Sequence, residues 1–262
     1  MKNNNVTIIK DISTNSINEL YRAKKLPIHK LGPSVLDIAP RQGVVLQSFN
    51  SQSALGLVSA AQLLDSTIPL NIAIGRAGSG KTLLALAAAI TQSIMDDCYS
   101  TIILTKPMEI VGSISLGAMP GDLHDKFSPY AISYMHQFGE LLGDNGHVLI
   151  EGFFQRGSIK YIPIQLMRGA SFKNSFIIAD EVQVLNQHEM LTLCTRVGQG
   201  SKLVLLGDLG QRDKNINIPD TGLYKLLNSN LVKASALAST ISLIKNERSP
   251  LVDLIDQALG GP

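Results

Sequence analysis

The chain has 262 residues, of which 45% are hydrophobic and 17% charged, and its formal net charge is +2. This length suits one large α/β domain with a buried core, with or without a small appendage. No apolar run approaches the roughly 18 residues of a membrane span, and the first residues lack the apolar core of a signal peptide. Cys98 and Cys194 form no Cys-x-x-Cys pair, which is typical of buried thiols in a reducing compartment. These features predict a cytoplasmic protein without overall basic character.

Residues 1–41 differ from the rest of the chain. They are polar, rich in Asn and Ser at first, interrupted by prolines, and hold more Lys and Arg than acidic residues. We expect a basic arm or small appendage there, followed by the main domain over residues 42–262. The basic arm could contact phosphate backbones, or it could be a solvated segment that aids solubility.

Short apolar runs alternate with helical patterns along the main domain. We expect strands at residues 70–74, 101–105, 175–179, 202–206 and 240–243, and helices at residues 53–64, 83–90, 186–197 and 221–227. Two further strand-like runs, residues 147–151 and 159–164, lie on either side of a turn-like segment at residues 155–158. Together they predict an inserted hairpin. Strands that alternate with helices predict an α/β fold with a mainly parallel sheet covered on both faces.

A phosphate-binding loop follows the first of these strands. The residues that fit G-x-x-x-x-G-K-[ST] are Gly75, Arg76, Ala77, Gly78, Ser79, Gly80, Lys81 and Thr82. Glycines let backbone N–H groups close around phosphate oxygens, and the N-terminus of the following helix adds positive potential. Lys81 is expected to reach the β- and γ-phosphates and Thr82 to ligate Mg²⁺. The loop therefore predicts binding of a nucleoside triphosphate.

Two acids end the apolar run at residues 175–179. A P-loop enzyme needs a carboxylate at such a position to hold Mg²⁺, which is the role expected of Asp180. The adjacent Glu181 is the candidate general base that polarises the attacking water. Ligands of such sheets bind at the carboxyl ends of the strands, and the acids are expected there.

Four further polar residues are candidates for the same site. Gln211 follows another buried strand and could sense the γ-phosphate, although a residue in a Gly-Asp turn can also lie in solvent. Arg196 and Arg248 are the candidates for an arginine that stabilises transition-state charge. Gln52 lies ahead of the loop and could recognise the adenine edge through its amide.

Several motifs, in this order, together resemble the PhoH family of P-loop ATPases over residues 50–260. Besides the loop they are Thr105-Lys106-Pro107, Leu116-Gly117 with Pro120-Gly121-Asp122-Leu123, Met167-Arg168-Gly169, Asp180-Glu181-Val182-Gln183, Thr195-Arg196-Val197-Gly198, Gly207-Asp208 with Gln211, Thr221-Gly222-Leu223 and Glu247-Arg248-Ser249. The chain departs from the family pattern at Ala170, where Arg is usual, and at Val184, where Asn is usual.

The resemblance implies a three-layer RecA-like core similar to one domain of superfamily-one helicases, with strand order 5-1-4-3-2. It also implies Mg²⁺-dependent ATP hydrolysis and a link to RNA or single-stranded nucleic acid, with Thr105, Lys106, Pro107 and Arg168 as the contact residues. Residues 1–41 are too short for the PIN nuclease that longer relatives carry, so no nuclease activity is expected. The compact form looks like versions found in bacteriophages, for which the compartment would be the host cytoplasm.

A single core domain predicts that the site is completed by a neighbouring subunit, in a ring that we expect to be a hexamer, with Arg196 or Arg248 acting across the interface. Two other functions compete with a nucleic-acid-linked ATPase. A small-molecule kinase needs no water-activating Glu, so Glu181 and Gln211 argue against it. An ATP-dependent assembly or regulatory switch with slow turnover stays open, because the sequence shows the nucleotide site but not its output. Aromatic residues amount to only 5% and no stacking surface for bases is evident, so nucleic-acid binding is implied by the resemblance more than by the residues.

Overall fold

The computed structural model describes residues 62–107, 131–138, 141, 146–210 and 217–243, with single residues at 254 and 258. The strands are β1 (Leu70–Gly75), β2 (Thr101–Thr105), β3 (Ile159–Tyr161), β4 (Ser175–Ala179), β5 (Lys202–Gly207) and β6 (Ala238–Leu243). The helices are α4 (Lys81–Ile90), α6 (Gly146–Gln155), α7 (Gln187–Cys194), α8 (Gly222–Asn228) and α9 (Asn230–Ala234). Shorter turns are η4 (Thr91–Met95), η6 (Ile164–Leu166), η7 (Val182–Val184) and η8 (Ile218–Asp220). The expected arm at residues 1–41 and residues 53–61 of the expected first helix lie outside the described residues.

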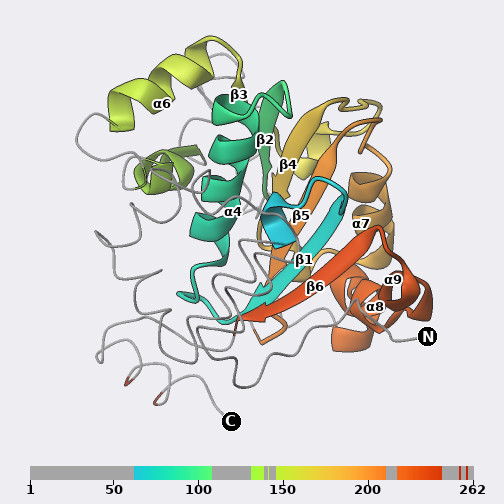
Figure 1. Ribbon diagram of the computed structural model, residues 1–262. Helices are drawn as coiled ribbons and strands as arrows, with labels where there is room; N and C mark the ends of the chain where they lie inside the picture. The colour runs from blue at the N-terminus through green and yellow to red at the C-terminus, as the bar shows by residue number, and fades with distance from the viewer. Residues whose placement is uncertain are drawn as a thin grey trace, which may run out of the picture.

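The strands form one six-stranded sheet in the order β3-β2-β4-β5-β1-β6, and all pairs are parallel. The five strands expected from the sequence, numbered along the chain, appear in the order 5-1-4-3-2, and β3 extends the sheet beside β2. β1 lies between β5 and β6, so the chain leaves the sheet between two neighbours at the end of β1. Helices cover both faces, α4 on one and α7 and α8 on the other (Figure 1), which confirms the three-layer α/β architecture.

The expected hairpin is wrong. Residues 147–151 belong to α6, and β3 pairs with β2 in parallel, with Ile159 opposite Ile102. The apolar residues of α6 have helical spacing, because Ile150, Phe153 and Phe154 all face the core. A parallel neighbour needs a crossover connection rather than a tight turn, and α6 lies in that connection, out beyond the β3 edge (Figure 1).

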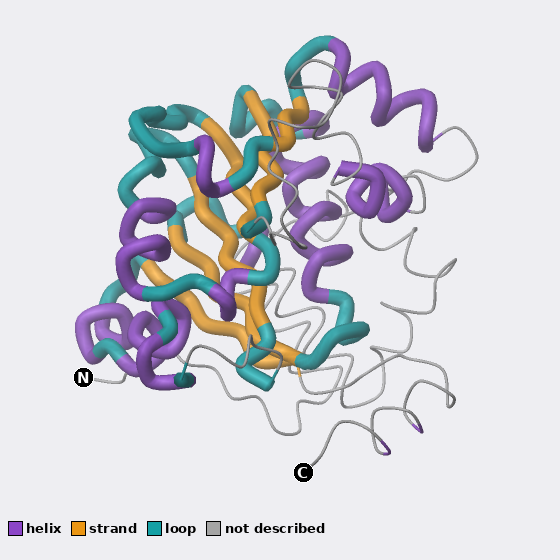
Figure 2. Tube along the Cα trace, turned by 180° about the vertical axis from the view of Figure 1, so that it is seen from behind, coloured by secondary structure: helices purple, strands orange, loops and turns teal. Residues whose placement is uncertain are grey.

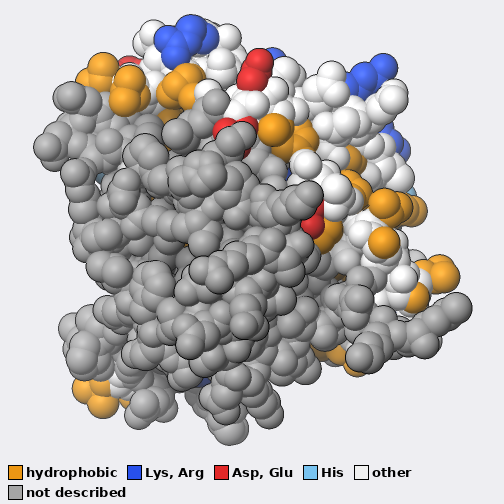
Figure 3. Space-filling model, in the orientation of Figure 1, with side chains coloured by type: hydrophobic (Ala, Val, Ile, Leu, Met, Phe, Trp, Pro, Cys, Tyr) orange, Lys and Arg blue, Asp and Glu red, His pale blue; other side chains and the backbone are white. Residues whose placement is uncertain are grey.

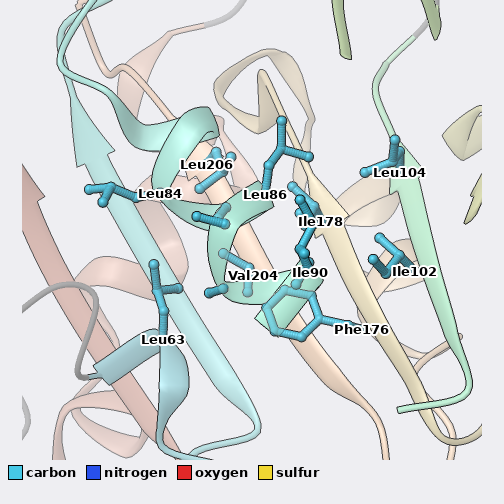
Figure 4. Packing of buried hydrophobic residues seen from close by; sticks show 14 of the residues in the cluster. Leu63, Leu84, Leu86, Ile90, Ile102, Leu104, Phe176, Ile178, Val204 and Leu206 are labelled. Carbon is cyan, nitrogen blue, oxygen red and sulfur yellow. The ribbon is translucent and has the colours of Figure 1, made fainter. Parts of the chain in front are cut away.

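Each face of the sheet has its own hydrophobic core. On the α4 face, Leu86 and Ile90 pack with Ile178, Val204 and Phe176 of the strands (Figure 4). The other face, turned toward the reader in Figure 2, buries residues of α7 and α8 against the strands, among them Ile177, Leu205, Met190, Leu193 and Leu223. Burial of one such aliphatic side chain stabilises the fold by about 1.5–3 kcal/mol, more than the helix propensity of any one residue. Packing on both faces holds the sheet in place. Because the strands are parallel, their carboxyl ends lie along one edge of the sheet.

The helices begin where their caps place them. α8 lies within one residue of its expected range at each end, whereas α7 ends at Cys194, three residues before the expected end. Both helices follow side-chain caps, with Asn186 accepting from Glu189 N and Thr221 accepting from Tyr224 N. α4 begins at Lys81, inside the glycine motif, and β6 begins two residues before the expected strand. No helix among the described residues is both long and apolar enough to cross a bilayer.

Candidate phosphate-binding and hydrolysis site

The glycine loop joins β1 to α4 in a conformation that its glycines permit. Gly78 and Gly80 have φ of 80° and 82°, and Gly80 is the N-cap of α4. These left-handed conformations are strained for any residue with a Cβ atom. At Gly75 a Cβ atom would lie 2.5 Å from the carbonyl oxygen of Leu243 and 2.8 Å from Ser79 Oγ. The sequence pattern therefore has a steric cause at the loop and at its contact with β6.

The polar groups of the loop suit an anion. Lys81 Nζ donates to the carbonyl oxygens of Gly75 at 2.6 Å and Arg76 at 2.9 Å, which holds the ammonium group over the loop. Ser79 Oγ is buried without a hydrogen-bond partner among the described residues. A buried hydroxyl that lacks a partner costs free energy, and a phosphate oxygen would accept its hydrogen bond. The loop thus has the donors that a bound phosphate requires.

Thr82 and Asp180 meet although they lie far apart in the chain. Thr82, in the first turn of α4, donates from Oγ1 to Asp180 Oδ2 at 3.0 Å. Asp180 directly follows β4, and its backbone N donates to the carbonyl oxygen of Thr105 at the end of β2, at 3.0 Å. Both oxygens are of the hard type that Mg²⁺ prefers. The pair expected from the sequence to hold the metal is therefore together.

The carboxyl of Asp180 lies in an environment that disfavours its charge. Burial raises its pKa, and the neighbouring charge of Glu181 raises it further, while hydrogen bonds from Thr82 and Glu181 N and the charge of Lys106 act in the opposite direction. A cation between the carboxylate and the loop would offset the costs of burial and of the like charge. The electrostatics of Asp180 are those of a site that fits a divalent ion.

Glu181 adopts a left-handed backbone conformation, with φ of 55°, and caps the short helix η7. Such a conformation in a non-glycine residue is strained, and strain of this kind clusters at functional sites. Its side chain accepts a 2.6 Å hydrogen bond at Oε2 from Gln183 Nε2. The turn after β4 and the hydrogen bond from Gln183 thus set the direction of the Glu181 side chain.

Asp208 closes the site from β5. Its Oδ2 accepts from the backbone N of Ala77 in the glycine loop at 3.2 Å, and its Oδ1 accepts from Gly210 N at 2.9 Å. Its own backbone N donates to Gln183 Oε1 at 3.2 Å. From the sequence, Asp208 is expected only in a turn, and Gln183 has no expected role. The signal in the sequence was that each residue lies just after a buried apolar run, β4 for Gln183 and β5 for Asp208.

Arg196 does not reach the glycine loop of its own chain. It follows α7, which runs back from the carboxyl end of β4 toward the amino ends of the strands. Its Nη1 donates to the carbonyl oxygen of Ala170 at 3.2 Å, and its own carbonyl accepts from Phe172 N at 2.9 Å, just before β4 begins. A role of Arg196 across a subunit interface stays a prediction.

The residues expected to contact nucleic acid are not brought together. Thr105 ends β2 beside Asp180, and Lys106 and Pro107 follow it, whereas exposed Arg168 precedes Ala170 at the Arg196 end of the sheet. Thr105 Oγ1 is buried without a partner among the described residues. In the view of Figure 3, the described Lys and Arg side chains are scattered rather than gathered in a stripe. Gln52, Gln211, Arg248 and the Leu116–Leu123 motif lie outside the described residues, so their roles stay predictions.

A parallel sheet, a glycine loop between β1 and α4, and a Thr–Asp pair at the carboxyl ends define a RecA-like P-loop nucleotide-binding fold. Comparison with known proteins gives the family. The profile described as "PhoH-like protein" matches residues 54–260, and the chain belongs to this family.

Curated relatives agree with this membership. Protein PhoH2 of Bacillus subtilis (strain 168) is 33% identical over 233 residues, which cover 84% of this chain and 52% of the relative. Protein PhoH2 of Thermobispora bispora is 30% identical over 256 residues, covering 92% of this chain and 57% of the relative. The chain thus spans about half the length of these relatives. Among solved structures, Pif1 helicase from Candida albicans matches with a TM-score of 0.34 and 17% identity, covering 76% of this chain and 43% of that one.

Proposed function

We propose that the protein hydrolyses ATP with Mg²⁺ and couples this reaction to RNA or single-stranded nucleic acid. The observation that carries the proposal is the 3.0 Å hydrogen bond between Thr82 and Asp180, with Glu181 next along the chain. This contact supports the proposal because it joins the first turn of α4 to the carboxyl end of β4, where Glu181 follows. Family membership supports the same reaction.

The residues of this chain divide the chemistry among them. The loop N–H groups and Lys81 bind and orient the triphosphate, and Thr82 and Asp180 would hold Mg²⁺. When bound, the ion would supply neutralisation of the triphosphate's negative charge. Glu181 accepts a proton from water as the water oxygen bonds to the γ-phosphorus and the bond to the ADP oxygen breaks, giving ADP and phosphate.

The second part of the proposal is a ring, most simply a hexamer. The position of Arg196 supports the ring. Its hydrogen bonds to Ala170 and Phe172 hold it near the amino end of β4, away from the glycine loop of its own chain. An arginine at that place can stabilise γ-phosphate charge only in a neighbouring subunit. We expect light scattering to give a mass of several subunits, with turnover that rises with protein concentration. A monomeric mass with undiminished turnover would contradict the ring.

A regulatory switch without unwinding is the second candidate. The bond between Asp208 and Ala77 favours it, because the loop is tied directly to a neighbouring strand whose position could report nucleotide binding. Phosphate release with and without single-stranded RNA or DNA distinguishes the two functions. We expect stimulation by single-stranded RNA for the coupled ATPase, whereas turnover indifferent to both nucleic acids would favour the switch.

A further inference from the structure

The side-chain amide of Gln183 uses both of its ends. Its Nε2 donates to Glu181 Oε2 at 2.6 Å, and its Oε1 accepts from Asp208 N at 3.2 Å. The residue is only 3% exposed. A buried amide with both ends bonded has a fixed orientation, because a flip would set a donor against a donor on one side and an acceptor against a carboxylate on the other.

The Gln183 amide fits beside β5 because residue 207 is a glycine. A Cβ atom at Gly207 would lie 3.2 Å from Gln183 Oε1 and 2.6 Å from Leu223 Cδ2. The absent side chain at the end of β5 therefore allows the amide to approach the backbone of Asp208. Leu223 of α8 closes the other side. The position of the amide is built by β5, η7 and α8 together.

The bonds continue from Asp208 to the glycine loop. The carboxylate of Asp208 accepts from Ala77 N, so a chain of hydrogen bonds runs from Ala77 through Asp208 and Gln183 to Glu181. This chain joins the loop that binds phosphate to the group that activates water. It crosses from β1 to β5 and from β5 to the turn after β4, which are neighbours in the sheet.

We infer that Gln183 is a positioning residue that holds the carboxylate of Glu181 and ties it to the glycine loop through Asp208. The inference rests on the proposed hydrolysis at this site. Glu181 is the only one of the three residues expected to meet the attacking water. Gln183 acts through Glu181 and contributes nothing to phosphate binding, so its loss lowers kcat and leaves nucleotide affinity in place.

Two substitutions test the two hydrogen bonds of the Gln183 amide. Gln183→Met keeps the length of the side chain and removes both hydrogen bonds. Gln183→Glu keeps an acceptor for Asp208 N but removes the donor and sets a like charge against Glu181. We expect both to lower kcat roughly 10- to 100-fold, as small misplacements of catalytic groups do. We also expect KM and the Kd of a nonhydrolysable ATP analogue to stay within about twofold. Gln155→Met, at the exposed end of α6, is the matched control and leaves both quantities unchanged.

A double substitution shows whether Gln183 acts through Glu181. In a Glu181→Ala background, Gln183→Met should leave the already low kcat unchanged, and the losses in Tm of the two single variants should not add. A further fall in kcat equal to that seen in the wild type would overturn the inference, as would a kcat of Gln183→Met within twofold of wild type. If the wild type has no turnover, the proposed hydrolysis fails, and the Tm values alone decide: additive losses overturn the contact, and non-additive losses support it.

Discussion

At the scale of single residues, charges placed in buried positions have the clearest consequences. Lys202 opens β5 and is fully buried, and its Nζ donates to the carbonyl oxygen of Asp65 at 2.8 Å. Burial lowers its pKa to about 8, against an opposing effect of the Asp65 charge. The buried ammonium thus helps to hold residues 62–65 against the sheet, at an electrostatic cost to the folded state.

This residue gives the protein a pH-dependent stability at alkaline pH. Between the folded pKa of about 8 and the ordinary value of 10.5, the unfolded chain binds more protons at Lys202 than the folded one, so the unfolding free energy rises with pH there. We expect a rise of up to about 3 kcal/mol for wild type relative to Lys202→Met. Urea unfolding of both proteins from pH 7 to pH 10.5 measures it. Parallel pH profiles would show that Lys202 does not titrate in this range.

At the scale of elements, caps rather than propensities set where helices begin. Asn186 Oδ1 accepts from Glu189 N at 3.0 Å, and Glu189 Oε2 accepts from Asn186 N at 2.9 Å, which forms a reciprocal capping box on α7. We expect Asn186→Ala to lower the unfolding free energy by about 1 kcal/mol. Denaturant titration checks this value, and Kd for nucleotide should not change, because the cap supports α7 and not the glycine loop.

The elements also show where sequence patterns suffice. The four central strands, β1, β2, β4 and β5, are predictable because each is a mostly apolar run with its middle buried on both faces, as Phe176 and Ile177 show. α6 and β3 are not, because β3 has only three residues at the sheet edge and α6 exposes Val148 and Leu149 on its outer side. In such short runs, the spacing of apolar residues does not distinguish a helix from a strand, so tertiary packing determines which one forms.

The same division holds for the candidate site. The glycine loop, Thr82, Asp180 and Glu181 are predictable because their chemistry fixes residue types and spacing. The contacts of Gln183 and Asp208 are not predictable, because they depend on β4, β5 and β1 ending side by side and on the space left at Gly207. A pattern indicates which groups a site needs, and the register of the sheet decides which other groups touch them.

At the scale of the whole molecule, the sheet order unites these residues. Since β4, β5 and β1 are consecutive neighbours, the three segments that carry Glu181, Asp208 and Ala77 end in one row. Contacts through this row can relate the state of the glycine loop to the turn that bears the candidate base. On this arrangement, we propose that Glu181 activates water at a triphosphate held by the loop.

Phosphate release by wild type and Glu181→Gln tests that claim most directly. With ATP and Mg²⁺ in excess, we expect the substitution to lower kcat by about 10²–10⁴-fold, the usual contribution of general base catalysis. The Kd for ATP should stay within about threefold of wild type, because Lys81, Thr82 and Asp180 are unchanged. A Glu181→Gln protein that releases phosphate at the wild-type rate would contradict the account.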